Sequence, residues 1–131
     1  MSLRLDEMKE IARRFVIEPW EHGHVDVLDE VCAPNYKVGH DGDIQQLKDA
    51  ILKTRVSFKN LKVTIHDMAA EGDLVAYRWT MTGIFEKAFN GVAPTGEEAS
   101  NTGITILRFE NGKIVEDQYE SSSDGVETPS T

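Results

Sequence analysis

The chain has 131 residues and a formal net charge of −9, with 23 acidic residues against 14 lysines and arginines. This length is typical of one domain, which buries enough surface to fold without a disulfide or a metal ion. The negative charge opposes binding to phosphate backbones and to anionic lipid, so we expect neither nucleic acid nor a membrane as a partner. No apolar run approaches the ~20 residues that span a bilayer.

A cytoplasmic location is predicted from the N-terminus and the cysteine content. The N-terminus begins with a charged amphipathic pattern instead of the apolar segment of a signal peptide. The single cysteine, Cys32, cannot form an internal disulfide and has apolar neighbours, so we interpret it as a small core residue.

Helical spacing of apolar residues predicts three helices in the N-terminal half of the chain. They cover about residues 3–20, 25–32 and 43–57, with Asp43 as the N-cap of the third. Alternation of apolar and polar residues then predicts a short strand at 36–38 and four strands at about 61–65, 75–82, 102–109 and 114–121. Helices followed by a meander of strands indicate an α+β fold with a curved antiparallel sheet packed on the N-terminal helices.

Two hairpins and a tail complete this organisation. Glu71-Gly72-Asp73 predicts one turn, and Asn111-Gly112 predicts a type I′ turn because both of its central residues need positive φ. Residues 1–121 are expected to form one pocket domain, and the small polar residues of 122–131 are expected to form a disordered tail.

The strand at 102–109 is apolar on both of its faces. Ile104 and Ile106 point one way, whereas Leu107 and Phe109 point the other, and Ile114 on the next strand is grouped with the outer face. The helices can cover only one face of the sheet. We therefore expect a second copy of the chain to cover the other face, giving a homodimer.

Four stretches of the chain carry a family resemblance: Ala33–Tyr36, Glu71–Trp79, Asn90–Gly96 and Leu107–Glu116. In this order and spacing they resemble the SnoaL-like polyketide cyclases of the nuclear transport factor 2-like superfamily, over about residues 8–116. The resemblance implies a cone-shaped α+β barrel in which helices close one end of a deep apolar cavity. It also implies that an acid on the last strand and a histidine on the strand before it promote an aldol ring closure in a bound polyketide.

The acid and histidine of the family do not transfer directly to this chain. The resemblance aligns the histidine with Thr105 and the acid with Tyr119, and neither side chain can take the expected role. Asp117 lies two residues before Tyr119 and therefore on the same face of the strand, which makes it the best remaining acid. It is either a general base or a strand-end carboxylate held by Arg78 or by solvent, and we expect Arg78 to point outward.

Other polar residues have two interpretations each. Tyr119 either donates a hydrogen bond to a ligand carbonyl or is a pocket-wall aromatic residue. His40, expected at the cavity mouth, is either a proton shuttle or a solvated loop histidine. The His22-Gly23-His24 spacing allows a metal site, but a surface turn between helices is the better interpretation.

The resemblance also predicts a pocket wall in which core residues line a ligand cavity. Its expected members are Phe15, Trp20, Tyr36, Phe58, Trp79, Met81, Phe89, Thr105 and Leu107. The sequence has no phosphate-binding loop, dinucleotide fingerprint or CxxC motif, so no cofactor and no metal is expected. We predict a pocket protein that binds or acts on a small, largely apolar carbonyl compound by acid–base chemistry. The alternatives are a non-catalytic binding protein and an interaction module that uses the outer face of the sheet.

Overall fold

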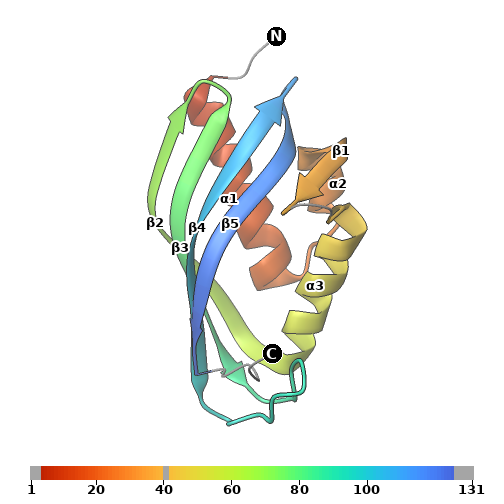
Figure 1. Cartoon of the computed structure of the whole chain (residues 1–131), viewed down its shortest axis with the longest axis vertical. Helices are drawn as coiled ribbons and strands as arrows, with labels where there is room; N and C mark the ends of the chain where they lie inside the picture. The colour runs from red at the N-terminus through yellow and green to blue at the C-terminus, as the bar shows by residue number, and fades with distance from the viewer. Residues whose placement is uncertain (1–3, 40–41, 126–131) are drawn as a thin grey trace.

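In the computed structural model, which describes residues 4–39 and 42–125, three helices pack on one face of a five-stranded sheet (Figure 1). This arrangement confirms the predicted α+β fold. In chain order the elements are α1 (Leu5–His22), α2 (Val27–Val31), β1 (Cys32–Val38), α3 (Ile44–Ser57), β2 (Phe58–Glu71), β3 (Leu74–Phe85), β4 (Glu98–Glu110) and β5 (Lys113–Asp124).

Local residue chemistry accounts for the ends of the two long helices. The side chain of Asp43 accepts a hydrogen bond from the backbone N–H of Gln46 at 2.9 Å, which confirms Asp43 as the N-cap of α3. Helix α1 continues past Pro19 to His22. Gly23 follows as its C-cap, with a φ of 73° that allows its N–H to reach the carbonyl oxygen of Pro19 at 2.9 Å. Helix α1 therefore ends two residues later than the sequence pattern predicts.

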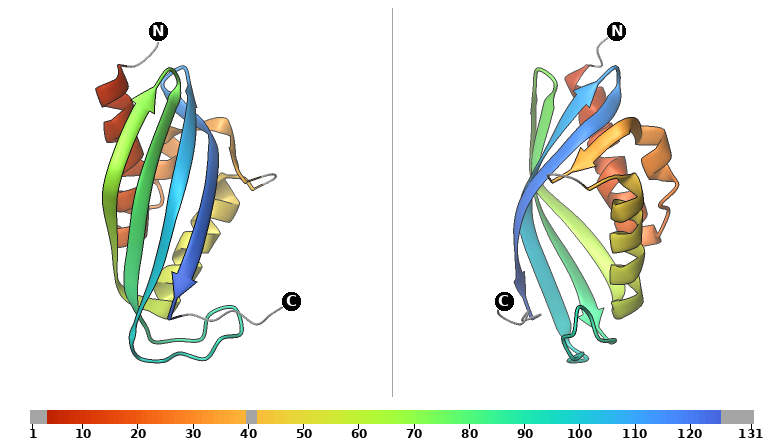
Figure 2. Two further views of the ribbon diagram at one scale, coloured as in Figure 1. Left: turned by 60° about the vertical axis from the view of Figure 1, so that its left-hand side comes forward. Right: turned by 45° about the vertical axis from the view of Figure 1, so that its right-hand side comes forward.

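The sheet has the strand order β1-β5-β4-β3-β2. The neighbouring pairs from β5 to β2 are antiparallel, but β1 runs parallel to β5, so the prediction of a wholly antiparallel sheet is wrong at this edge. The chain enters β1 from α2 and reaches β5 only after the whole meander, so no hairpin imposes an antiparallel direction. Strands β1 and β2 form the two edges, and the curved sheet remains open (Figure 2).

Several strands are longer than the alternation of residues predicts. Strand β2 begins directly after α3 and contains register shifts between Lys59 and Lys62 and between Ile65 and Asp67, which interrupt its polar–apolar pattern. Strand β5 continues to Asp124, because residues 122–124 pair with Thr102, Asn101 and Ser100 of β4. Residues 122–124 therefore belong to the sheet and not to a disordered tail, and residues 126–131 lie outside the described part of the chain.

The two faces of the sheet differ as predicted on β4. Leu107 is fully buried and Phe109 nearly so, in a core shared with α1, whereas Ile104 and Ile106 are 53% and 45% exposed on the outer face. Ile114 does not belong to that outer face, because it is fully buried. A register shift between Arg108 and Phe109 places Ile114 opposite Phe109, which turns it toward the core.

The turns and the helices agree with two further expectations. Asn111 and Gly112 have φ values of 51° and 79°, the signs that a type I′ turn requires. None of the helices seen in residues 4–39 and 42–125 combines the length and the apolar character of a bilayer-spanning helix.

Candidate functional site

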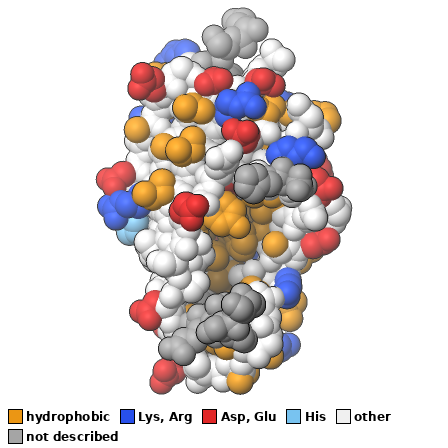
Figure 3. Space-filling model, in the orientation of Figure 1, with side chains coloured by type: hydrophobic (Ala, Val, Ile, Leu, Met, Phe, Trp, Pro, Cys, Tyr) orange, Lys and Arg blue, Asp and Glu red, His pale blue; other side chains and the backbone are white. Residues whose placement is uncertain are grey.

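A hollow of about 270 Å³ lies between the concave face of the sheet and helices α1 and α3. Figure 3 shows it as a recess whose walls carry hydrophobic side chains. Phe15, Trp20, Trp79, Met81 and Thr105 all border this hollow, as the sequence predicts, and Val16, Val38, Leu47, Ala50 and Val63 extend its apolar wall. Among the described residues that line it, Asp117 is the only one with an acidic or basic side chain.

Asp117 is a buried carboxylate at the wall of this hollow. Its residue is 6% exposed, and one carboxylate oxygen, Oδ2, accepts a hydrogen bond from the hydroxyl of Tyr36 at 2.9 Å. Burial raises the pKa of Asp117 to about 6, and the hydrogen bond from Tyr36 opposes that rise. The carboxyl group therefore changes its protonation state close to neutral pH.

Arg78 does not neutralise Asp117. Its guanidinium lies on the outer face of the sheet, where Nε and Nη2 each lie 2.8 Å from Oδ2 of Asp67. The prediction that Arg78 points outward is confirmed, because residue 78 alternates with the inward-facing Tyr77 and Trp79.

The parallel edge of the sheet brings Tyr36 to Asp117. Val38 of β1 pairs with Asp117 of β5, and the backbone N–H of Gly39 donates to the carbonyl oxygen of Asp117 at 2.9 Å. Tyr36 is only 1% exposed and lies behind the wall, so it is not the pocket-wall residue that the sequence predicts. Burial and the nearby Asp117 raise the pKa of Tyr36 far above its usual value, so its hydroxyl remains a donor.

Trp79 forms a wall of the hollow because β4 leaves room for its ring. Its indole Nε1–H donates to Oγ1 of Thr105 at 2.9 Å. A Cβ atom at Gly103, on β4, would lie 2.7 Å from Cζ2 of Trp79. The glycine at this position therefore permits the close approach of the indole to the strand.

The other predicted pocket residues have different places. Leu107 does not line the hollow, because it is fully buried in the core cluster that contains Met8 and Phe15 of α1. Phe58 and Phe89 line a second hollow of about 150 Å³. Tyr119 borders the first hollow but is 54% exposed, which places it at the mouth. His40 lies outside the described residues.

Four further polar residues line the hollow: Gln46, Tyr77, Asn101 and Ser121. Strand alternation predicts this place for Tyr77 and Ser121, because they share the parity of Trp79 and Asp117. Tyr77 is buried, and this burial, with the nearby Asp117, raises the pKa of its hydroxyl far above the usual value. Asn101 shares the parity of Thr105 on β4, whereas Gln46 reaches the hollow only through the packing of α3.

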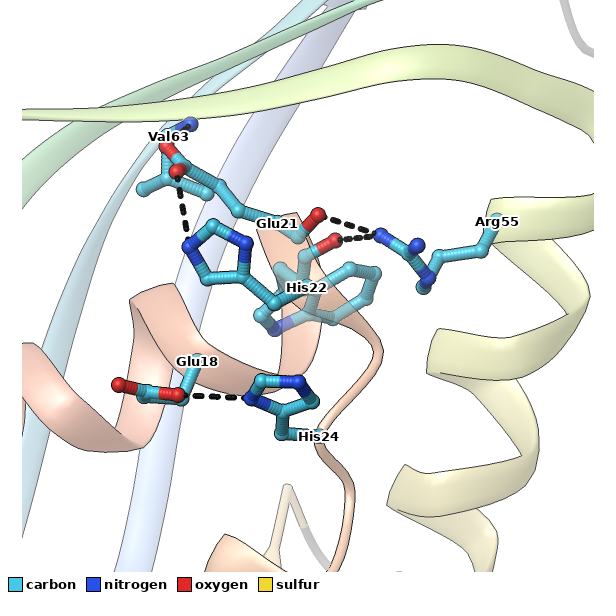
Figure 4. A network of polar contacts seen from close by, with 7 residues as sticks. Glu18, Glu21, His22, His24, Arg55 and Val63 are labelled. Carbon is cyan, nitrogen blue, oxygen red and sulfur yellow. Dashed lines mark hydrogen bonds and ion pairs between the residues drawn. The ribbon is translucent and has the colours of Figure 1, made fainter.

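A polar network fixes the end of α1, which carries Trp20 (Figure 4). Nη1 of Arg55, on α3, donates to the carbonyl oxygens of Trp20 and Glu21 at 2.8 and 2.7 Å. Oε1 of Glu21 accepts from the backbone N–H of Val63, on β2, at 2.7 Å. These contacts join α1 to α3 and to the sheet, and so they hold the backbone of Trp20 in place beside the hollow.

The two histidines of this region have separate partners. Nδ1 of His24 lies 2.9 Å from Glu18, and Nε2 of His22 lies 3.8 Å from Glu21. In the part of the chain that the structure describes, no three His, Cys, Asp or Glu side chains gather to hold a metal ion. His22 and His24 are both exposed, so the H-x-H spacing lies at a surface turn.

A curved open sheet with helices packed on its concave face is the nuclear transport factor 2-like, or ketosteroid isomerase-like, class of fold. The profile of the SnoaL-like polyketide cyclase family matches residues 10–122. The chain therefore belongs to the SnoaL-like polyketide cyclase family.

Solved structures show the same fold. TsrD from Streptomyces laurentii is 22% identical, with a TM-score of 0.84 and coverage of 92% of each chain. IdmH from Streptomyces antibioticus, a candidate polyketide cyclase, is 26% identical, with a TM-score of 0.75 and coverage of 88% of this chain and 91% of its own. A protein from Catenulispora acidiphila with a ketosteroid isomerase-like fold, bound to trimethylamine, is 22% identical, with a TM-score of 0.64 and coverage of 85% and 84%. No curated protein sequence is significantly similar to this chain.

Proposed function

We propose that this protein uses Asp117 as a general base on a small, largely apolar carbonyl compound, without a cofactor. The observation that carries the proposal is a buried carboxylate at the wall of an apolar hollow, with its pKa raised to about 6. A base of this pKa is largely ionised at neutral pH, yet holds a proton more strongly than an exposed aspartate does. Membership of the SnoaL-like family is consistent with this chemistry.

The proposed step is removal of a proton from the carbon next to the ligand carbonyl. Oδ2 of Asp117 is engaged by Tyr36, so Oδ1 is the oxygen that takes the proton. Negative charge then develops on the carbonyl oxygen of the ligand and needs a hydrogen-bond donor. Tyr77 and Tyr119 border the same hollow, and their hydroxyls are the donors that we propose for this role.

A non-catalytic binding protein is the second candidate function. The positions that align with the histidine and the acid of the family carry Thr105 and Tyr119, which pair across β4 and β5. Neither residue is a histidine or a carboxylic acid. In this alternative the hollow holds its ligand without turnover, and Asp117 serves as a hydrogen-bonding group.

Exchange of α-protons for deuterium separates the two functions. Acetophenone is incubated with the protein in D₂O, and proton NMR follows the loss of its methyl signal. We expect the wild type to accelerate exchange, and Asp117→Asn to slow it by ~10²–10⁴-fold, as for loss of a general base. The matched control is Asp67→Asn, because Asp67 is an exposed carboxylate on the outer face. Binding of acetophenone without accelerated exchange would favour the binding protein.

A further inference from the structure

The second hollow continues the first along the same concave face. The two hollows share Trp20, Met81 and Asn101. On β5 the inward-facing residues run from Asp117 through Ser121 in the first hollow to Ser123 in the second. At ~3.3 Å per residue, Asp117 and Ser123 are about 20 Å apart along the strand. One elongated molecule can therefore extend from one hollow into the other.

The two hollows differ in chemistry. The first contains Asp117, whereas the described residues that line the second carry no charge. The second hollow has an aromatic end, where the rings of Phe58 and Phe89 meet edge to face with centroids 5.3 Å apart. Nζ of Lys53, on α3, lies 5.5 Å from the centroid of Phe89, on the loop before β4, which helps to hold this ring in place.

Volume also favours joint use of the two hollows. The first, at about 270 Å³, falls just below the ~300–1,000 Å³ of sites that bind drug-sized ligands, and the second adds about 150 Å³. We propose that the hollow beyond Trp20 and Met81 is a binding site for the apolar tail of an elongated carbonyl compound whose carbonyl head lies at Asp117. This inference rests on the proposed function of Asp117 and adds the shape of the substrate: a polar head with a long alkyl or aryl tail.

The shared residues make Met81 a determinant of ligand length. It follows Tyr77 and Trp79 on the inner face of β3 and lines both hollows. Methionine has three rotatable bonds and adapts its shape to a ligand at low cost. A tail passes beside this side chain and Trp20, whose backbone Arg55 fixes.

Affinity as a function of chain length tests the tail site. Quenching of the fluorescence of Trp20 and Trp79 would measure the binding of methyl ketones with butyl, octyl and dodecyl chains, and of alkylbenzenes with the same chains. Full burial of each methylene tightens binding by about fourfold, so we expect affinity to keep rising from octyl to dodecyl. Ala99→Leu, which fills the second hollow from β4, should remove the gain in affinity from octyl to dodecyl. It should weaken the binding of the butyl ketone far less than that of the dodecyl ketone.

Two further variants secure the result. Phe89→Ala removes the aromatic wall at a half-buried loop position and should also reduce the preference for dodecyl chains, even if Ala99→Leu fails to fold. Leu52→Ala, at an exposed position of α3, is the control and should leave the dependence of affinity on chain length unchanged. Three results would overturn the tail site. They are an affinity that does not rise from octyl to dodecyl, a dodecyl affinity that both second-hollow variants leave intact, and no binding by either series. A length-dependent alkylbenzene series with no advantage for the ketones would support the tail site and contradict the proposed carbonyl chemistry.

Discussion

The raised pKa of Asp117 should make the stability of the protein depend on pH. The pKa rises from an ordinary value of 3.8 to about 6 on folding, and burial is the main cause. The folded state then binds more protons than the unfolded state between about pH 4 and pH 6, so the free energy of unfolding falls as the pH rises through this range. At about 1.4 kcal/mol per pKa unit, the ionised carboxylate costs roughly 3 kcal/mol at neutral pH.

Asp117→Asn removes this titration and keeps the shape of the side chain. Its amide oxygen can still accept the hydrogen bond from Tyr36, so the variant retains that contact. Relative to the wild type, we expect the variant to gain up to about 3 kcal/mol between about pH 4 and pH 8, with most of the change complete by about pH 7. The sign of this stability change is unusual, because we expect the replacement of a buried, hydrogen-bonded carboxylate to stabilise the protein at neutral pH.

Urea unfolding at a series of pH values measures this difference directly. The wild type, Asp117→Asn and the exposed control Asp67→Asn would be unfolded in parallel, with the slope of each transition checked for two-state behaviour. The stability difference between Asp67→Asn and the wild type should change little with pH, because this variant keeps Asp117 and exposed ion pairs contribute little. If the stability difference between Asp117→Asn and the wild type is the same at about pH 4 and pH 8, the carboxylate has an ordinary pKa, and the argument for a tuned base fails.

Three other changes test the site and its surroundings. Tyr36→Phe removes the hydrogen bond that lowers the pKa of Asp117, so carbon-13 NMR of labelled aspartate should show the carboxyl titrating at a higher pH than in the wild type; an unchanged midpoint would contradict this. We propose that the exposed Ile104 and Ile106 form a homodimer interface, so Ile106→Glu should shift the sedimentation of the protein to that of a monomer, whereas Leu52→Glu, equally exposed on α3, should not. Burial raises the pKa of the Cys32 thiol to about 12, so iodoacetamide should label it at mildly alkaline pH only after unfolding, and rapid labelling of the folded protein would indicate a reactive thiol.

Sequence patterns were sufficient to predict the features that depend only on neighbouring residues along the chain. Asp43 caps α3 because its carboxylate reaches an N–H three residues away, and Asn111-Gly112 turns because both residues tolerate positive φ. Strand parity placed Asp117 on the inner face and Arg78 on the outer face for the same reason, since side chains alternate along a strand. The family resemblance, which also depended on short stretches in a fixed order, was confirmed by the match of the SnoaL-like family profile to residues 10–122.

Tertiary structure alone decided how deep each side chain lies and what covers it. Alternation assigns a face but not a depth, so it could not separate Leu107 in the core from Tyr119 at the mouth, or Phe58 in the second hollow from Trp79 in the first. The hydrogen bond between Tyr36 and Asp117 joins residues that are 81 positions apart and depends on the parallel pairing of β1 with β5, which no local signal specifies. The raised pKa of Asp117 has the same origin, because distant segments of the chain must pack together before they can exclude water from its carboxylate.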